Sequence, residues 1–185
     1  MSNKGKLFVL SGPSGVGKGT LREHALNDLS NLVYSISCTT RKPREGETNG
    51  VEYRFITHEK FEEDIRQNLF LEYAHVHSDY YGTLKADVER ELDAGKNVLL
   101  EIDVQGALQV RDKIHEAVLI FVAPPSIETL ESRLRNRNTE SEEALRVRLS
   151  NAAKELDLQN EYDYIIVNDD LDKACEELRR IIHDD

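Results

Sequence analysis

Residues 7–20 read Leu7-Phe8-Val9-Leu10-Ser11-Gly12-Pro13-Ser14-Gly15-Val16-Gly17-Lys18-Gly19-Thr20. An apolar run typical of a buried strand ends at a glycine-rich turn, and a lysine and an amphipathic, helix-like segment follow. The glycines at positions 12, 15 and 17 let the backbone turn tightly and point its N–H groups at an anion. The helix that begins near Lys18 adds the positive end of its dipole, and the lysine ammonium can reach outer phosphates. The pattern predicts a phosphate-binding loop rather than a chance glycine-rich turn.

The loop departs from the usual pattern at one position. The residue after the lysine is normally Ser or Thr, whose hydroxyl binds magnesium. Here Gly19 takes that place, and Thr20 comes one residue later. Either Thr20 takes part, or phosphate oxygens and water hold most of the metal. The sequence leaves both possibilities open.

Bulk properties limit the class of protein. The 185 residues fit one domain with a sizeable core. The net charge of −11 argues against a general binder of nucleic acid or membrane surfaces. Cys38 and Cys175 lack CxxC spacing, and the chain lacks a signal-peptide pattern or a membrane-length apolar run. We expect a cytoplasmic protein with two reduced, structural thiols, of unknown oligomeric state.

Strand-like and helix-like segments alternate along the chain. This alternation predicts an α/β fold, in which a parallel sheet carries helices on both faces. Ser126 is a candidate N-cap, and Gly95 a candidate helix end. We expect core strands over 6–10, 33–38, 97–103, 117–123 and 164–168, and helices over 18–29, 84–94, 105–114, 126–137, 142–159 and 171–183.

Residues 39–83 break this rhythm. Val51, Tyr53 and Phe55 alternate with polar residues, which predicts a half-exposed antiparallel strand. Thr57 is placed to cap a short helix over 58–66, and further strands are expected over 69–76 and 79–83. We therefore expect a small, mostly-β insertion on the parallel core. The basic stretch 133–148 forms a second, smaller insertion.

A basic turn follows the second core strand. Arg41 and Arg44 flank Pro43, and two guanidinium groups so placed suit a phosphate or a carboxylate. A solvated basic turn is the alternative. Three of the tyrosines in the same insertion are candidates for contact with the phosphate through their hydroxyls, although tyrosines on strands more often belong to the core or sheet surface. They are Tyr53, Tyr80 and Tyr81.

Glu72 lies inside the apolar stretch 69–74. A carboxylate there needs a partner or faces a cavity. Guanine offers its N1–H and N2 amino group side by side, so that one carboxylate accepts from both, whereas adenine has neither donor at this edge. The alternative for Glu72 is an exposed position on the polar face of a strand.

Residues 101–106 follow the third core strand. Carboxylates at the carboxyl end of a parallel strand lie on the ligand face of such a sheet, which makes Glu101 and Asp103 candidates. Asp103-x-x-Gly106 is also similar to a GTPase switch element, but no Asn-Lys-x-Asp motif accompanies it. His75 and His77 lack a third ligand at suitable spacing, so a solvated strand is favoured over a metal site.

Five arginines fall between Arg133 and Arg148. Arg133 and Arg137 share one helix face by their i, i+4 spacing. One interpretation is a solvated amphipathic helix whose partners are nearby glutamates. The other is a mobile lid whose arginines neutralise charge during phosphoryl transfer.

Taken together, these motifs resemble those of the guanylate kinase family over nearly the whole chain. The resemblance implies transfer of the γ-phosphoryl of ATP to GMP, and to dGMP, with Mg²⁺, giving ADP and GDP in purine metabolism. It implies one domain with a core (1–36, 84–132 and 149–185), a GMP-binding insertion (37–83) and a lid (133–148). The matching segments are 11–20, 37–46 (SCTTRKPREG), 50–55 (GVEYRF), 70–76 (FLEYAHV), 80–83 (YYGT), 100–106 (LEIDVQG), 133–148 and 164–171 (YIIVNDDL).

The resemblance also implies site residues by position. Those for the ATP phosphates are Gly12, Pro13, Ser14, Gly15, Val16, Gly17, Lys18, Gly19 and Thr20, with Asn168 near the adenine. Those for the GMP phosphate are Arg41, Arg44, Tyr53 and Tyr81, and those lining the guanine are Ser37, Glu72, Thr83 and Asp103. Catalysis would rest on Lys18, Arg133, Arg137 and Arg148. The chain departs from the family at Gly19, usually Ser, and at Asn138, usually Gly.

Two other functional hypotheses compete with that of a GMP kinase. A guanylate-kinase-like interaction module would keep the fold without turnover. Loss of the loop lysine or of the lid arginines would favour such a module, but this chain retains both. A kinase for another monophosphate is suggested by Gly-Lys-Gly-Thr, which also looks like adenylate kinase. Glu72 and the Arg41/Arg44 turn argue against it.

Overall fold

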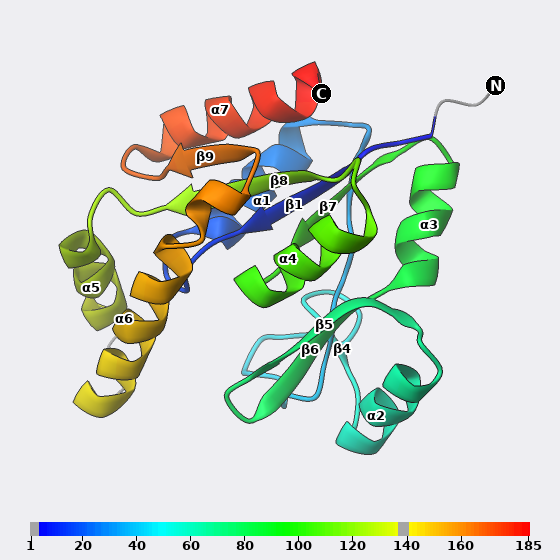
Figure 1. The fold of residues 1–185 in the computed structure, drawn as a ribbon, viewed down its shortest axis with the longest axis horizontal. Coiled ribbons are helices and arrows are strands. Elements are labelled where there is room, and N and C mark those ends of the chain that lie inside the picture. The colour runs from blue at the N-terminus through cyan, green and yellow to red at the C-terminus, as the bar shows by residue number, and fades with distance from the viewer. Residues whose placement is uncertain (1–3, 137–140) are drawn as a thin grey trace. The chain divides into compact units, whose positions relative to one another are not determined.

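The computed structural model describes residues 4–136 and 141–185 (Figure 1). The chain divides into two compact units. Unit 1 comprises Asn31–Leu100 and Gln105–Ala117, together with residues 4–7. Unit 2 comprises Phe8–Ser30, Glu101–Val104 and Val118–Asp185. The fold is α/β, with parallel strands and flanking helices, which confirms the predicted fold class.

Unit 2 is built on three parallel strands in the order β1-β8-β9. Every residue of β1 and β8 is buried, as expected of strands covered on both faces. The strands are β1 (Leu7–Ser11), β8 (Val118–Ala123) and β9 (Tyr164–Val167). The helices are α1 (Lys18–Asp28), α5 (Ile127–Asn136), α6 (Glu142–Leu156) and α7 (Leu171–Asp184), with a short 3₁₀ helix at Gln159–Glu161.

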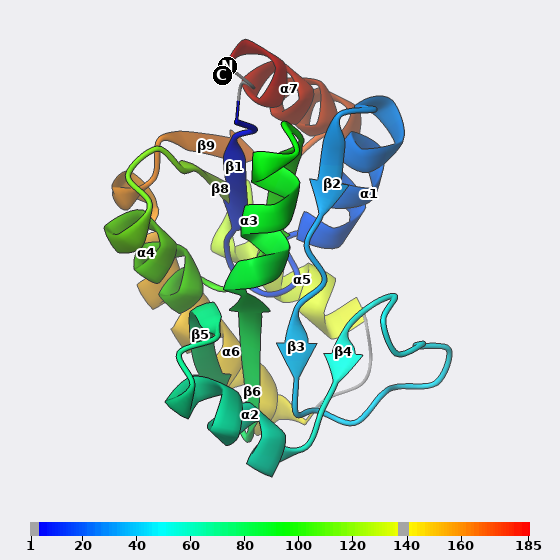
Figure 2. The ribbon, with the colours of Figure 1, turned by 90° about the vertical axis from the view of Figure 1, so that its right-hand side faces the viewer.

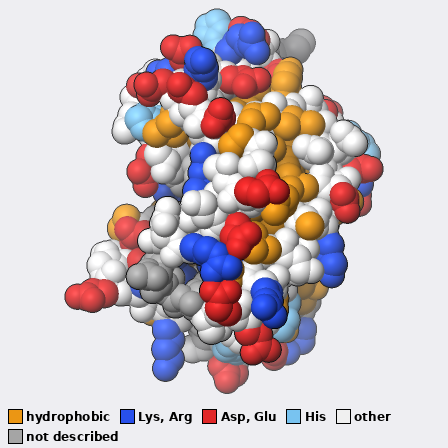
Figure 3. All heavy atoms as spheres, turned by 90° about the vertical axis from the view of Figure 1, so that its left-hand side faces the viewer, with side chains coloured by type: hydrophobic (Ala, Val, Ile, Leu, Met, Phe, Trp, Pro, Cys, Tyr) orange, Lys and Arg blue, Asp and Glu red, His pale blue; other side chains and the backbone are white. Residues whose placement is uncertain are grey.

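Strand β9 is more exposed than its neighbour. Among the described residues it pairs with β8 alone, and three of its four side chains, Tyr164, Ile165 and Val167, are exposed. A space-filling view shows hydrophobic side chains gathered in a band (Figure 3). Ile166 is fully buried, and α7 packs against the strand. The burial pattern is that of an edge strand, whereas β8 has the pattern of a central one.

Helices α5 and α6 pack on each other through one leucine-rich cluster. Leu130 and Leu134 of α5 meet Leu145 and Ala152 of α6, with Leu149 packed beside them. Each helix begins at a serine cap: the Ser126 hydroxyl accepts from Thr129 N–H at 3.1 Å, and the Ser141 hydroxyl from Ala144 N–H at 3.2 Å. The predicted Ser126 cap is confirmed.

Unit 1 contains a parallel strand pair and a four-stranded sheet, and Figure 2 labels the strands of the four-stranded sheet. The pair is β2 (Leu32–Tyr34) and β7 (Asn97–Glu101). The sheet has the order β4-β3-β6-β5, from β3 (Cys38–Thr39), β4 (Arg54–Phe55), β5 (Phe70–Val76) and β6 (Asp79–Leu84). The helices are α2 (His58–Arg66), α3 (Lys85–Asp93) and α4 (Val104–Lys113).

Helix α2 covers one face of the four-stranded sheet. Phe61 stacks on Phe70 at 4.3 Å and on Tyr80 at 5.0 Å between ring centroids, and Cys38 completes the cluster. A β-carbon at Gly82 would lie 2.8 Å from the Phe70 ring, so this close packing requires glycine. The sheet is thus held by an aromatic core on its α2 side, which leaves its other face for the candidate site.

The predicted elements of this insertion are partly confirmed. The Thr57 cap is present, since its hydroxyl accepts from Lys60 N–H at 3.1 Å, and α2 spans the predicted 58–66. The prediction of an antiparallel strand around Val51 is wrong. Strand β4 is two residues long and pairs parallel with β3. Residues 48–51 instead form a turn with a Val51 N–H to Thr48 carbonyl bond of 3.1 Å.

Two other expected boundaries are wrong. The strand expected over 33–38 stops at Tyr34, and Cys38 begins β3 in another sheet, because the chain changes pairing partners within one apolar run. The helix expected over 142–159 ends at Leu156. Gly95 follows α3 with φ +80°, as a helix-ending glycine does. Both cysteines are free and buried. None of the helices in the described residues combines the length and apolar character needed to cross a membrane.

Candidate functional site

The loop between β1 and α1 has the backbone geometry of an anion cradle. Gly12, Gly15 and Gly17 have φ values of +140°, +84° and +99°, which other residues rarely adopt. Gly17 occupies the N-cap of α1 without a capping side chain, and the first turn carries no acidic residue. The N–H groups of that turn therefore remain available to an anion at the positive end of the helix.

The Lys18 side chain folds back over this loop. Its ammonium donates to the carbonyl oxygens of Gly12 at 2.5 Å and Pro13 at 3.0 Å. These bonds hold a cation at the mouth of the loop, where it adds to the N–H groups and the helix dipole. The loop thus presents three sources of positive potential to one point.

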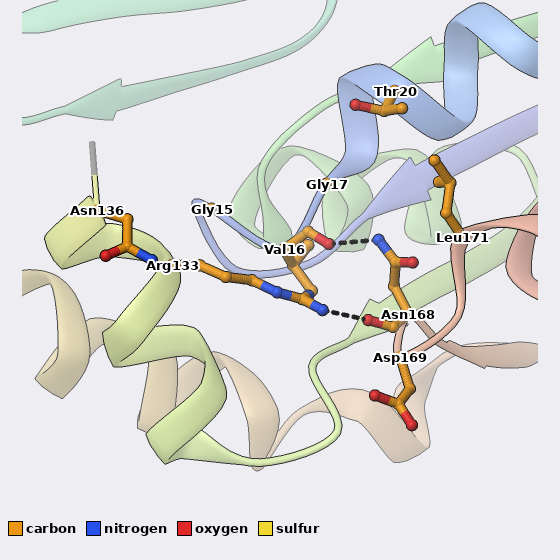
Figure 4. A pocket seen from close by; sticks show the side chains of 9 residues that line it. All are labelled: Gly15, Val16, Gly17, Thr20, Arg133, Asn136, Asn168, Asp169 and Leu171. Carbon is orange, nitrogen blue, oxygen red and sulfur yellow. Dashed lines mark hydrogen bonds between the residues drawn. The ribbon is translucent and has the colours of Figure 1, made fainter.

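A pocket of about 390 Å³ opens beside the loop (Figure 4). The buried Asn168 side chain donates to Val16 carbonyl at 2.8 Å, and Arg133 donates to the Asn168 carbonyl at 2.9 Å. A β-carbon at Gly17 would lie 2.5 Å from the Asn168 amide, so glycine permits this close approach. The lining residues are Gly15, Val16, Gly17, Thr20, Arg133, Asn136, Asn168, Asp169 and Leu171.

The arginines of α5 and α6 have different partners. Arg148 donates to the Ser14 hydroxyl of the loop, and Arg133 reaches Asn168. Arg135 instead pairs with Glu131 and Glu142, as a solvated helix face would. Arg137 lies outside the described residues. Of the predicted lid arginines, Arg133 therefore lines the pocket and Arg148 contacts the phosphate loop itself. Arg135 takes the structural role.

Carboxylates approach the loop from two further elements. Glu101, at the end of β7, pairs with Arg22 of α1 at 2.8 Å. Burial raises the pKa of Glu155 on α6, and the nearby charges of Lys18 and Asp103 act on it in opposite directions. Lys18 and Asp103 are thus both close enough to Glu155 for their charges to affect its pKa. The described residues contain no group of three or more metal-ligating side chains.

In unit 1, Arg41 is the centre of a cluster of aromatic and charged side chains. Its guanidinium lies over the Tyr53 ring at 5.3 Å, and Tyr53 meets Tyr81 edge-on with 5.8 Å between centroids. Glu47 accepts from both terminal nitrogens of Arg41, at 2.9 Å each. Hydrogen bonding to Glu47 raises the pKa of Arg41, and Tyr81 adds to this effect. The cluster holds a permanent positive charge against two phenol rings.

Glu72 and Thr83 form a buried polar pair in the same sheet. The Thr83 hydroxyl donates to Oε1 of Glu72 at 2.6 Å, and the two side chains are 0% and 2% exposed. Glu72 is therefore not an exposed strand residue. The ladder is irregular between Phe70 and Glu72, and this bulge lets Phe70 enter the aromatic core while Glu72 pairs with Thr83.

One strand links the two features of unit 1. Tyr81 and Thr83 are two residues apart on β6, so their side chains lie on the same face, about 7 Å apart along the strand. Gly82, between them, faces the aromatic core. A ligand with an anionic group near Tyr81 and hydrogen-bond donors near Glu72 would match this spacing.

The two units each gather part of the predicted site. Unit 1 brings Arg41, Tyr53 and Tyr81 together and buries Ser37. Arg44 is exposed and contributes its backbone N–H to Glu47 at 2.7 Å. Unit 2 brings Lys18, Arg133, Arg148 and Asn168 to the phosphate loop.

The sequence interpretation missed several residues. Asn136, Asp169 and Leu171 line the pocket, and Glu47 pairs with Arg41. The run Asn168-Asp169-Asp170-Leu171 at a strand end was a signal for two of the pocket residues. Glu47 gave no such signal, because its pairing depends on how the turn folds.

Comparisons with known proteins agree on one family. The family model described as guanylate kinase matches residues 4–185. A protein named guanylate kinase from Fusobacterium nucleatum is 52% identical over 178 residues, with 96% of each chain covered. Another from Clostridium tetani is 49% identical, covering 97% of this chain and 86% of the relative.

Solved structures agree as well. A crystal structure of guanylate kinase from Anaplasma phagocytophilum matches with a TM-score of 0.81 and 33% identity, covering 99% of this chain and 87% of that one. A shikimate kinase from Bacteroides thetaiotaomicron, 15% identical with a TM-score of 0.54, shares the fold alone.

Proposed function

Because the chain belongs to the guanylate kinase family, we propose that unit 2 holds ATP and that unit 1 holds GMP. The chain is an enzyme, an ATP:GMP phosphotransferase that gives ADP and GDP. The proposal concerns which residues perform this reaction. The glycine loop and Lys18 would bind the ATP phosphates, and Asn168 would border the adenine.

The buried Glu72–Thr83 pair is the observation that carries the acceptor assignment. A carboxylate removed from water needs donors, and the N1–H and N2 amino group of guanine supply two. Arg41, Arg44, Tyr53 and Tyr81 would take the phosphate, while Ser37 and Asp103 would complete the guanine contacts. An adenine would leave the Glu72 carboxylate without these partners, at a cost that disfavours AMP.

Catalysis in this proposal is positioning and charge neutralisation. Phosphoryl transfer spreads negative charge over the equatorial oxygens, and cations aimed at them lower the barrier. Lys18, Arg133, Arg137 and Arg148 would supply these cations. The Arg148 contact with Ser14 supports a role at the loop, and the lid would span 133–148.

The residues near the loop fit Mg²⁺ carried in by ATP. Magnesium accepts one or two carboxylates together with phosphate oxygens and water. Thr20 lines the pocket, and Glu101 lies beside Gly19, so this region offers a hydroxyl and a carboxylate as ligands for the ion. When bound, the ion would neutralise charge on the transferred phosphoryl.

The proposal has three further parts. The chain would act as one domain with a core (1–36, 84–132 and 149–185) and a GMP-binding insertion over 37–83. It would accept dGMP as well as GMP. Two buried free thiols and a net charge of −11 fit a reducing, cytoplasmic setting.

A substrate panel tests the proposal. ADP release is measured with GMP, dGMP, AMP, CMP and UMP at equal concentration, with the Lys18→Met variant as background. We expect turnover with GMP and dGMP, and kcat/KM at least about a hundredfold lower with AMP. Equal turnover of AMP and GMP would contradict the role of Glu72.

A further inference from the structure

The turn that carries Arg41 and Arg44 is closed by Glu47. Glu47 N–H donates to the Arg44 carbonyl at 3.1 Å, with Gly46 at φ +87° in the third turn position. The Glu47 carboxylate reaches back to Arg44 N–H at 2.7 Å. The same carboxylate bonds both terminal nitrogens of Arg41. One side chain therefore fixes the backbone at Arg44 and the guanidinium of Arg41.

The bonds made by Arg41 leave part of its guanidinium available. Arginine has five N–H donors in a fixed planar arrangement. Glu47 takes one from each terminal nitrogen, and the Lys42 carbonyl takes the second donor of Nη1 at 2.8 Å. The Nε–H and the second donor of Nη2 are left for a ligand or for the Tyr81 hydroxyl, which also interacts with this guanidinium. These two donors lie side by side as a second fork, and a phosphate that binds there would join or replace the Tyr81 hydroxyl.

We infer that Glu47 is a positioning residue for the acceptor phosphate: it holds Arg41 by one fork so that the other fork receives the phosphate. This inference rests on the proposed function of unit 1 as the GMP site. Glu47 contacts no reacting atom in this account and acts through Arg41. Its contribution is preorganisation, because an arginine already held in place loses less freedom on binding.

The surroundings favour a fixed pair over a carboxylate that the phosphate must displace. The side chains of Arg41 and Glu47 are 15% and 17% exposed, so the pair is largely removed from water. The guanidinium also lies over the rings of Tyr53 and Phe55, at 5.3 and 5.7 Å. Hydrogen bonding to Arg41 lowers the pKa of Glu47, which keeps both groups charged at neutral pH. Displacing Glu47 would break two Arg41 bonds and the Arg44 turn bond together.

The test compares Glu47→Gln with Glu45→Gln. Both changes remove one negative charge from the same turn, but Glu45 is exposed and makes none of these bonds. Affinity for GMP is measured by calorimetry, and affinity for guanosine, which lacks the phosphate, by NMR titration. We expect Glu47→Gln to weaken GMP binding at least tenfold, with guanosine affinity unchanged. We expect Glu45→Gln to bind GMP as the parent does, or slightly more tightly.

Steady-state kinetics and a double variant separate positioning from a general structural role. Glu47→Gln should raise KM for GMP while kcat at saturating GMP and KM for ATP stay near parent values. In an Arg41→Met background, Glu47→Gln should cause no further loss of GMP affinity. Glu47→Asp keeps the charge on a shorter side chain and should give an intermediate loss of GMP affinity. It replaces Glu47→Gln in these measurements if Glu47→Gln fails to fold.

The outcomes are separable. If Glu47→Gln, or Glu47→Asp in its place, binds GMP as tightly as the parent or more tightly, Glu47 competes with the phosphate and the inference is wrong. Equal losses for GMP and guanosine, or an undiminished loss in the Arg41→Met background, also overturn it. If the parent protein fails to bind GMP at all, the proposed function itself fails.

Discussion

The Glu101 carboxylate lies against the backbone of Gly19: its Oε1 is 3.9 Å from the point that a β-carbon at Gly19 would occupy. The same carboxylate pairs with Arg22 at 2.8 Å. Gly19 stands where the resemblance leads one to expect Ser. The gap left by the missing hydroxyl is thus bordered by a carboxylate that Arg22 holds in place.

Gly19→Ser should therefore fold normally, because the added atoms meet only ordinary contacts. Gly12→Ala should lower the melting temperature by at least about 5 °C, since its φ is +140° and the new β-carbon would overlap the Val122 carbonyl. Thermal unfolding followed by circular dichroism measures both. Gly19→Ser should also lower the Mg²⁺ concentration for half-maximal activity, and an unchanged requirement would show that the loop hydroxyl is unimportant here.

Lys18→Met should lower kcat by about a hundredfold or more, because it removes a cation aimed at the transferred phosphoryl. Its bonds to Gly12 and Pro13 also order the loop, so the circular dichroism spectrum is recorded alongside. Lys173→Met, an exposed lysine of α7, is the matched control and should keep parental kcat. A loss of less than about tenfold at Lys18 would contradict its assignment.

Glu72→Gln should lower kcat/KM for GMP by roughly 30- to 150-fold, since an amide donor would then face a base N–H. Thr83→Val should give a smaller loss, because it removes the hydroxyl that holds Oε1 of Glu72 but leaves the carboxylate. KM for ATP should stay unchanged in both variants. Initial rates over a grid of GMP and ATP concentrations give these values, and unaltered GMP kinetics in Glu72→Gln would exclude a role in base recognition.

Arginines of the lid and of the basic turn should differ in what they affect. Arg148→Met and Arg137→Met should lower kcat with little change in GMP affinity, because they would engage only the transferring group. Arg41→Met and Arg44→Met should weaken GMP binding itself. GMP affinity from calorimetry, together with kcat, separates the lid variants from the basic-turn variants. Parental kcat in both lid variants would show that the segment is a solvated helix pair.

Cys38 should be unreactive toward iodoacetamide at pH 8 while the protein is folded. Burial beside Phe61 and Phe70 raises its pKa to about 11, so the thiolate is scarce. A pKa raised in the folded state stabilises the protein below the unfolded thiol pKa, and this contribution is lost as pH rises toward 11. Between pH 8 and pH 10, denaturant unfolding should therefore show a larger loss of stability in the parent protein than in Cys38→Ala, which keeps only the similar contribution of Cys175. Rapid labelling of folded protein would contradict the burial of this thiol.

The sequence by itself determined the phosphate loop and most of the parallel core. Glycine positions and buried strands leave local signatures, since φ > 0 needs glycine and strands covered on both faces need continuous apolar runs. Lys18 and the loop could be placed for the same reason. The cap at Thr57 and the extent of α2 followed from local hydrogen-bonding chemistry that does not depend on distant residues.

Tertiary structure decided what depends on pairing between distant residues. The run 33–38 contained no sign that Tyr34 and Cys38 belong to different sheets, because the hydrophobicity of a segment does not specify which strand it pairs with. The bulge that turns Glu72 toward Thr83 likewise depends on the register of β5 against β6. The pairing of Glu47 with Arg41, six residues apart, required the folded turn: sequence supplies the charges, but only the backbone path brings a carboxylate and a guanidinium within 2.9 Å.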